Sequence, residues 1–182
     1  MRCLFSVGSV RLHLEPMVPW MLSIADYNSS IEVLFKILRK EYTEDTWKLE
    51  TTSNLELVCY HSCEISSSPA RLEYRITYNE AYAVPKLLFR GSLQDGTPVP
   101  LSYFWECFAK NFPQHQNDIW STISQTEHPI TGVPYFFLHP CTTATLMSDI
   151  NPPTGLAYLT FWLSYIARYF NLFIPESIVQ KL

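Results

Sequence analysis

The strongest constraint on the fold is a stretch of eight residues, 71–78, in which polar and apolar side chains alternate almost without interruption. A period of two places successive side chains on opposite faces of a β-strand. Leu72, Tyr74, Ile76 and Tyr78 then share one face, and polar side chains occupy the other. The stretch therefore predicts a half-buried strand, with its apolar face against the core of the protein.

Other segments carry further secondary-structure signals. Apolar residues recur at steps of three and four over residues 23–41, which predicts an amphipathic helix. Strands are predicted over residues 47–49, 55–60, 84–90 and 133–138, and helices over residues 103–112, with Ser102 as N-cap, and 156–172. One helix, several consecutive strands and then helices predict an α+β fold with a mainly antiparallel sheet flanked by helices.

Composition limits the class of protein. A chain of 182 residues with 47% hydrophobic and 16% charged residues is typical of one globular domain. A net charge of −4 without a lysine or arginine cluster argues against nucleic acid as a partner. No segment reaches the roughly 18 apolar residues of a membrane span. We expect residues 1–20 to be a poorly ordered N-terminal extension, and the odd number of cysteines, five, to indicate a reducing compartment such as the cytoplasm.

One of these cysteines occupies a position suited to catalysis. The buried strand predicted over residues 133–138 must stop at His139-Pro140, because proline has no N–H for the β-ladder. Cys141 follows directly, on the first residue of a predicted loop. A nucleophilic thiol needs such a fixed position, access from solvent and nearby backbone N–H groups. The alternative, a small buried core residue, remains open on this pattern.

A second group of sulfur and imidazole side chains suggests a metal site. Cys59, His61 and Cys63 alternate, so they can share one face of a strand. A structural zinc site needs a second pair of ligands, which this spacing does not supply. We therefore expect no metal and no cofactor.

Four stretches together resemble the autophagy-related protein ten family of ubiquitin-conjugating-type enzymes. They are Leu138-His139-Pro140-Cys141 with Thr143 and Met147; residues 120–123 with 127–129; residues 78–82 with 84–85, 87–90 and 93–96; and residues 159–163. The related autophagy-related protein three family shares the His-Pro-Cys triplet, so the combination and its order carry the specificity. The resemblance covers roughly residues 70–175.

The resemblance implies a fold and an activity. It implies one catalytic domain over residues 21–182 with a ubiquitin-conjugating-enzyme-like fold. Cys141 would accept autophagy-related protein twelve as a thioester from the activating enzyme, autophagy-related protein seven. It would then pass that acyl group to a lysine of autophagy-related protein five, which is nucleophilic catalysis through a covalent intermediate.

One catalytic group of ordinary ubiquitin-conjugating enzymes is missing. Those enzymes have an asparagine after a His-Pro pair, shortly before the cysteine, that helps to stabilise the oxyanion. Here Cys141 itself follows the His-Pro pair, so the donor must come from elsewhere. Tyr78, Asn79 and His139 are the candidates. Each also has a structural alternative: Tyr78 as a core aromatic, Asn79 as a turn former and His139 as a cap at the strand end.

Two other classes of function compete with this interpretation. The first is a cysteine hydrolase of ubiquitin-like conjugates, with Cys141 as nucleophile, His128 or His139 as base and Asp149 near in sequence. The second is a non-catalytic autophagy adaptor that uses aromatic surfaces and strand edges.

The resemblance also implies how the target is recognised, because family members bind their target directly. We therefore also expect the strand pair within residues 71–90 to be a docking edge, with Glu73 and Arg75 facing outward.

Overall fold

A computed structural model of the chain describes residues 21–42, 46–111, 122–170, 172, 174 and 178. The predicted N-terminal extension, residues 1–20, lies outside the described residues, as does Trp120. The helices and strands are α1 (Ile24–Glu41), β1 (Trp47–Thr51), β2 (Leu55–Ile65), β3 (Ser68–Asn79), β4 (Val84–Leu93), α2 (Leu101–Asn111), β5 (Ile123–Glu127), β6 (Pro134–Leu138), α4 (Pro140–Ile150) and α5 (Leu156–Ala167).

The predicted α+β class is confirmed, with four local differences from the sequence interpretation. Every strand and helix predicted from the pattern is present, but strand β5 and helix α4 were not predicted. Helix α2 begins at Leu101, so Ser102 lies inside the helix and its predicted role as N-cap is wrong. Helix α5 ends at Ala167, five residues before the predicted end at Leu172.

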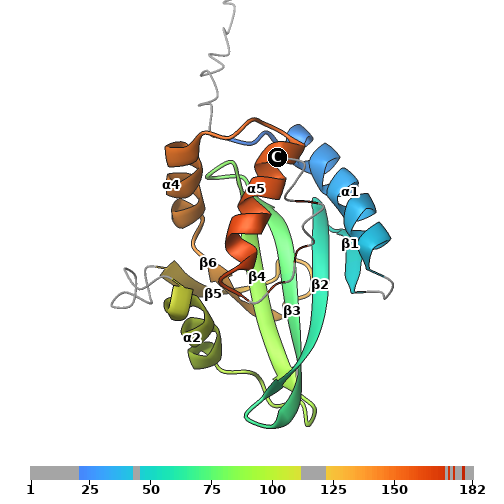
Figure 1. The fold of residues 1–182 in the computed structure, drawn as a ribbon, viewed down its shortest axis with the longest axis vertical. Helices are drawn as coiled ribbons and strands as arrows, with labels where there is room; N and C mark the ends of the chain where they lie inside the picture. The colour runs from blue at the N-terminus through green and yellow to red at the C-terminus, as the bar shows by residue number, and fades with distance from the viewer. Residues whose placement is uncertain are drawn as a thin grey trace, which may run out of the picture.

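The described strands form one antiparallel sheet in the order β1-β2-β3-β4-β6-β5. Strands β2, β3 and β4 are long and twisted and run through the middle of the molecule (Figure 1). Because β3 pairs with β2 on one side and β4 on the other, the strand pair of residues 71–90 is not an edge. The predicted docking edge is therefore wrong, and β1 and β5 are the edges of the described sheet.

The helices pack on one face of this sheet (Figure 1). The predicted alternation in β3 holds, since Leu72, Tyr74 and Ile76 are buried in the shared core. Helix α5 is apolar on most faces because it lies deep in that core, where Trp162 is fully buried. The Trp162 indole N–H donates to Thr143 Oγ1 at 3.3 Å, which joins α5 to α4.

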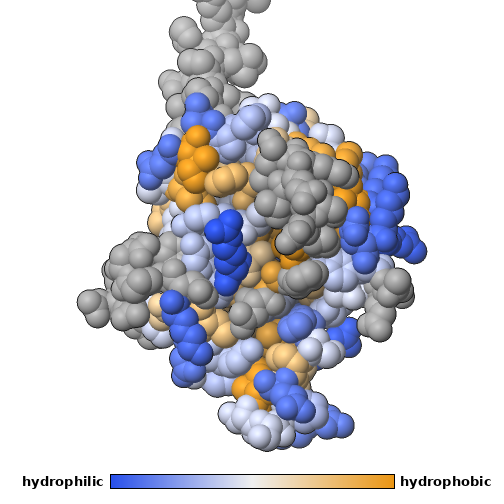
Figure 2. Space-filling model, in the orientation of Figure 1, coloured by the Kyte–Doolittle hydropathy of each residue, from blue (hydrophilic) through white to orange (hydrophobic). Residues whose placement is uncertain are grey.

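Helix α1 is capped at its start and anchored to the sheet through its buried face. Ser23 is the N-cap, and its hydroxyl oxygen accepts a hydrogen bond from the Asp26 backbone N–H at 3.0 Å. The Tyr27 hydroxyl lies 2.9 Å from the Ile76 carbonyl oxygen and 3.1 Å from that of Leu55, and so ties α1 to β3 and to β2. Hydrophilic side chains cover the outer side of α1, at the right of Figure 2.

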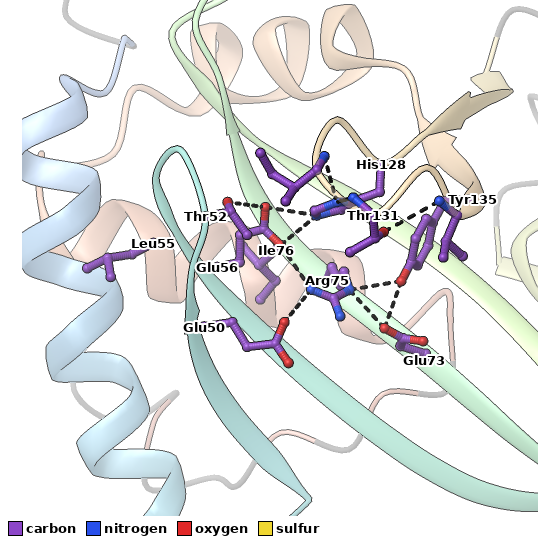
Figure 3. Close-up of polar contacts among 12 residues, drawn as sticks. Glu50, Thr52, Leu55, Glu56, Glu73, Arg75, Ile76, His128, Thr131 and Tyr135 are labelled. Carbon is purple, nitrogen blue, oxygen red and sulfur yellow. Dashed lines mark hydrogen bonds and ion pairs between the residues drawn. The ribbon is translucent and has the colours of Figure 1, made fainter.

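The opposite face of the sheet carries a buried charge cluster, formed by Glu50, Glu56, Glu73, Arg75, Arg90, His128 and Tyr135. Figure 3 labels all of these residues except Arg90. Arg75 lies at its centre, with Nη1 2.6 Å from Glu50 and 3.1 Å from Glu56, and Nε 2.8 Å from Glu73. Glu73 and Arg75 are only 5% and 7% exposed, so the prediction that they face outward to solvent is wrong. They do point away from the helices, but neighbouring strands and the loop after β5 cover them.

Hydrogen bonds to this cluster decide the charge state of Glu73. Burial by itself would raise the pKa of this carboxyl group. Donors on Tyr135, Arg90 and Arg75 outweigh the burial and hold the pKa of Glu73 below its usual value. Glu73 is thus an anion that stabilises the fold only while it remains ionised.

Candidate active site

Cys141 lies in the first turn of α4. His139 is the N-cap of this helix and Pro140 the first helical residue, a position where proline is favoured because its missing N–H has no helical partner. The prediction that Cys141 stands in a loop is therefore wrong, although its place directly after strand β6 is as expected. The unpaired backbone N–H groups of a first helical turn favour negative charge close by.

His139 contacts the thiol directly. Its Nδ1 atom lies 2.7 Å from Cys141 Sγ and also accepts a hydrogen bond from the Cys141 backbone N–H at 3.2 Å. Nδ1 is therefore the acceptor nitrogen of the ring, and the ring proton belongs on Nε2. In this tautomer the thiol can pass its proton to Nδ1 as the sulfur becomes a nucleophile. The His139 backbone N–H donates to the Thr122 carbonyl oxygen at 2.9 Å, which fixes the residue to the chain just before β5.

The turn between β3 and β4 lies beside this pair and brings in Tyr82. The Tyr82 ring meets the His139 ring edge-on at 6.0 Å between centroids, and the side chain is 38% exposed. The Asn79 side-chain oxygen accepts a hydrogen bond from the Tyr82 backbone N–H at 3.0 Å. In the sequence, Tyr82 stands out only as part of a stretch that carries the family resemblance, and no periodic pattern predicts its contact with His139.

Asn79 and Tyr78 differ in whether their side-chain donors are already used in hydrogen bonds. The Asn79 side-chain nitrogen makes no hydrogen bond that the described residues account for, so its two N–H groups can donate to a substrate. The Tyr78 hydroxyl donates to the Leu22 carbonyl oxygen at 2.7 Å, and its ring packs against Tyr27 at 5.3 Å. Burial, helped by Glu80, raises the pKa of Tyr78. The structure thus gives Tyr78 a tethering role and leaves Asn79 with unused donors.

His128, the other candidate base, belongs to the charge cluster. It is fully buried, with Nε2 3.0 Å from Glu56, and its Nδ1 accepts from the backbone N–H groups of Ile130 and Thr131. Asp149 is exposed near the end of α4. Within the described residues no carboxylate contacts His139, so the arrangement there is a dyad of thiol and imidazole without a third member.

The other cysteines have different surroundings. Burial raises the pKa of Cys59 to about 12, which makes it a poor nucleophile. Cys63 and Cys107 are half-buried, and burial raises the pKa of Cys107. In the part of the chain that the structure describes, no three His, Cys, Asp or Glu residues are grouped to hold a metal ion. None of the described helices is long and apolar enough to cross a bilayer.

An antiparallel sheet with its helices on one face, and a cysteine that follows a strand at the start of a helix, agree with the ubiquitin-conjugating-enzyme-like fold that the resemblance implies. The family model described as "Autophagocytosis associated protein, active-site domain" matches residues 26–177. The chain therefore belongs to this family, and its resemblance to autophagy-related protein ten (ATG10) is confirmed by curated relatives.

Those relatives are named "Ubiquitin-like-conjugating enzyme ATG10". The protein from Homo sapiens is 36% identical over 129 residues, which is 63% of this chain and 57% of the relative. The protein from Arabidopsis thaliana is 30% identical over 166 residues, 84% of this chain and 67% of the relative. The chain thus spans between about half and two thirds of the length of these relatives.

A solved structure confirms the predicted fold. The crystal structure titled "Autophagic E2, Atg10" superimposes with a TM-score of 0.51 at 17% identity, over 84% of this chain and 99% of the other. At that identity the likeness concerns the fold alone.

Proposed function

We propose that this chain is a ubiquitin-like protein transferase of the conjugating type. In this proposal Cys141 accepts autophagy-related protein twelve as a thioester from autophagy-related protein seven and passes it to a lysine of autophagy-related protein five. The similarity to relatives named as ubiquitin-like-conjugating enzymes supports the conjugating activity. In this proposal the reaction takes place in the cytoplasm, a compartment in which cysteines stay reduced.

The observation that carries the proposal is the 2.7 Å contact between His139 Nδ1 and Cys141 Sγ at the start of α4. In the loading step His139 takes the thiol proton while the sulfur attacks the thioester carbonyl carbon of the activating enzyme. The tetrahedral intermediate then expels the activating-enzyme thiolate, and a new thioester remains on Cys141. Negative charge on the sulfur is favoured by the first turn of α4 throughout this step.

The discharge step needs a second group. A lysine amine attacks the thioester carbonyl carbon, negative charge develops on the carbonyl oxygen, and the Cys141 thiolate leaves. We assign the donor to the oxyanion to the Asn79 side-chain N–H groups, because the Asn79 oxygen is held by the turn and the nitrogen is unused. His139 takes the proton that the attacking amine loses and gives it to the leaving Cys141 sulfur. Tyr82, edge-on to His139, remains 38% exposed beside the thiol–imidazole pair.

Mass spectrometry tests the proposal. The full chain is mixed with the activating enzyme, the modifier and ATP, and the product is analysed with and without reductant. We expect an adduct that reductant removes and that maps to Cys141. A chain that forms no such adduct, while the activating enzyme is itself loaded, would contradict the proposal.

The competing functions give different results in the same mixture. A cysteine hydrolase would hydrolyse a ubiquitin-like peptide ester without activating enzyme or ATP. Such an enzyme would also need a third residue to orient His139. An adaptor would keep its binding after alkylation of Cys141. The short contact between His139 and the thiol favours the transferase over an adaptor, since an adaptor has no use for an activated sulfur.

A further inference from the structure

A cavity of about 430 Å³ opens on the face of the sheet opposite the helices. Its walls include Tyr60, Arg71, Arg90, Ser92, Thr131 and Tyr135. Thr131 and Tyr135 lie on the same side of the sheet as Glu73, next to the buried charge cluster (Figure 3). Strands β2, β3 and β4 thus form the floor and one side, and the loop between β5 and β6 forms the other.

Arg71 lines this cavity and Lys48 lies beside its Tyr60 wall, and neither has a carboxylate partner among the described residues. The Arg71 guanidinium lies 4.3 Å from the centroid of the Tyr60 ring, and Lys48 Nζ lies 5.5 Å from the same centroid. Neither Arg71 nor Lys48 forms an ion pair with any described residue. Both side chains are exposed, so their N–H donors are available.

Arg90 adds a third source of donors. Its Nε donates to Glu73 at 2.7 Å, but the side chain is still 44% exposed, whereas Arg75 is enclosed by three carboxylates. Arg71 pairs with Ser92, and Glu73 with Arg90, in the ladder between β3 and β4. Arg71 and Arg90 are thus diagonal neighbours on one face, a distance that long side chains can span.

The charge of this surface is opposite to that of the whole chain. The charged side chains that line the cavity are three arginines, Arg71, Arg75 and Arg90, and one carboxylate, Glu73. Their charges sum to +2, in a chain whose net charge is −4. Because Glu73 already contacts Arg75 and Arg90, the uncompensated charge in the cavity wall lies at Arg71.

We propose that this cavity binds an acidic peptide segment of a protein partner, with a carboxylate held between Arg71 and Arg90. Planar guanidinium groups match carboxylates in geometry as well as in charge. Tyr60 and Tyr135 supply the aromatic surface that protein interfaces favour, beside the arginines that such interfaces also favour. This combination fits a peptide better than a lipid headgroup, which needs no aromatic walls.

The cavity is remote from the reaction. Arg71 and Asn79 lie on β3, eight residues apart, which corresponds to about 26 Å along an extended strand. The site can therefore hold a partner without entering the chemistry at Cys141. The inference goes beyond the transferase proposal and does not depend on it, since binding can be measured on the unloaded chain.

The test is a titration of the full chain with a synthetic peptide that alternates glutamate and leucine, followed by amide NMR shifts. We expect saturable binding, with shifts confined to the residues around Tyr60, Arg71, Ser92 and Thr131. Arg71→Gln should weaken the binding about tenfold, and Lys48→Gln should weaken it less. The same peptide with lysine in place of glutamate should not bind.

A matched control separates a built site from general charge attraction. Arg39 is an exposed arginine on α1 that also lies over an aromatic ring, Phe35, at 5.9 Å. Arg39→Gln removes the same charge and should leave peptide binding unchanged. Equal weakening by Arg39→Gln and Arg71→Gln, or shifts spread over the whole surface, would overturn the proposal.

Two further probes distinguish the source of the anion. Inorganic phosphate and vesicles of phosphatidylserine and phosphatidylcholine are titrated in parallel. Binding to the vesicles that depends on Arg71 and exceeds binding to the peptide would replace the protein partner with a membrane surface and overturn the proposal. Circular dichroism and thermal unfolding of each variant confirm that any loss of binding is not a loss of fold.

Discussion

The Nδ1 atom of His139 lies 2.7 Å from the sulfur of Cys141 and caps helix α4 at the same time, through the Cys141 backbone N–H. A single nitrogen therefore serves the fold and the chemistry. Replacing His139 by alanine would disturb both, and the result could not be assigned to either. Asparagine separates them, because it is a good N-cap but a poor base.

We expect His139→Asn to keep the fold and to slow loading of Cys141 by roughly a hundredfold at neutral pH, since general-base catalysis typically contributes at least that much. The rate should recover as pH rises, because hydroxide then removes the thiol proton. Single-turnover loading measured across pH checks this. His139→Ala should in addition lose about 1 kcal/mol of stability in thermal unfolding, the usual cost of a lost cap. Equal loading by wild type and His139→Asn at neutral pH would remove His139 from the mechanism.

Cys141→Ser should give either no adduct or an oxyester that survives reductant. The other thiols provide controls. Changing Cys63 or Cys107 to serine should leave the reductant-sensitive adduct intact. Changing Cys59 to serine should also leave it intact, because burial raises the pKa of the Cys59 thiol and keeps it protonated. The measurement is mass spectrometry of the loaded chain. A reductant-sensitive adduct on Cys141→Ala would assign the thioester to another cysteine.

Asn79→Ala should load normally and discharge to lysine about a hundredfold more slowly, because removing one oxyanion donor has a cost of that order. Tyr78→Phe should behave differently. It loses the hydrogen bond to Leu22 and about 1 kcal/mol of stability, with little change in discharge. Following loading and discharge separately in single turnovers decides between the two residues. If Tyr78→Phe slowed discharge and Asn79→Ala did not, the assignments would be reversed.

The Glu73 carboxylate predicts the acid dependence of stability. The pKa of Glu73 is lowered in the folded protein. Its contribution to stability is therefore fully present above the pKa that glutamate has in the unfolded chain, about 4.3. This contribution is lost as pH falls through the lower pKa of the folded protein. Glu73→Gln should be less stable at pH 7, by about 1–3 kcal/mol. Its stability should also change less than that of wild type between pH 5 and pH 3. Urea unfolding at both pH values checks this, with the exposed Glu80→Gln as a control, and parallel pH dependences would contradict it.

Periodicity explains which parts of the fold were predictable. Alternation in β3 and the three- and four-residue steps of α1 are properties of neighbouring residues, and both elements appear where the pattern placed them. The position of Cys141 directly after a strand was predictable for the same reason. Pro140 has no N–H to donate, so it ends the preceding strand whatever the rest of the fold is. The family resemblance added the fold, which the structural comparison confirms.

Pairing between distant segments explains the rest. Strand β5 is short and mostly polar, and it is a strand only because β6 supplies its ladder. Outward-pointing Glu73 and Arg75 are buried because Glu50, Glu56 and Tyr135 arrive from other strands. The contact between Tyr82 and His139 joins two turns nearly sixty residues apart in the chain. By itself the sequence determined most of the elements and the position of the thiol directly after strand β6. Only the tertiary structure decided which faces stay open and which groups surround the sulfur, because those depend on contacts that no local pattern encodes.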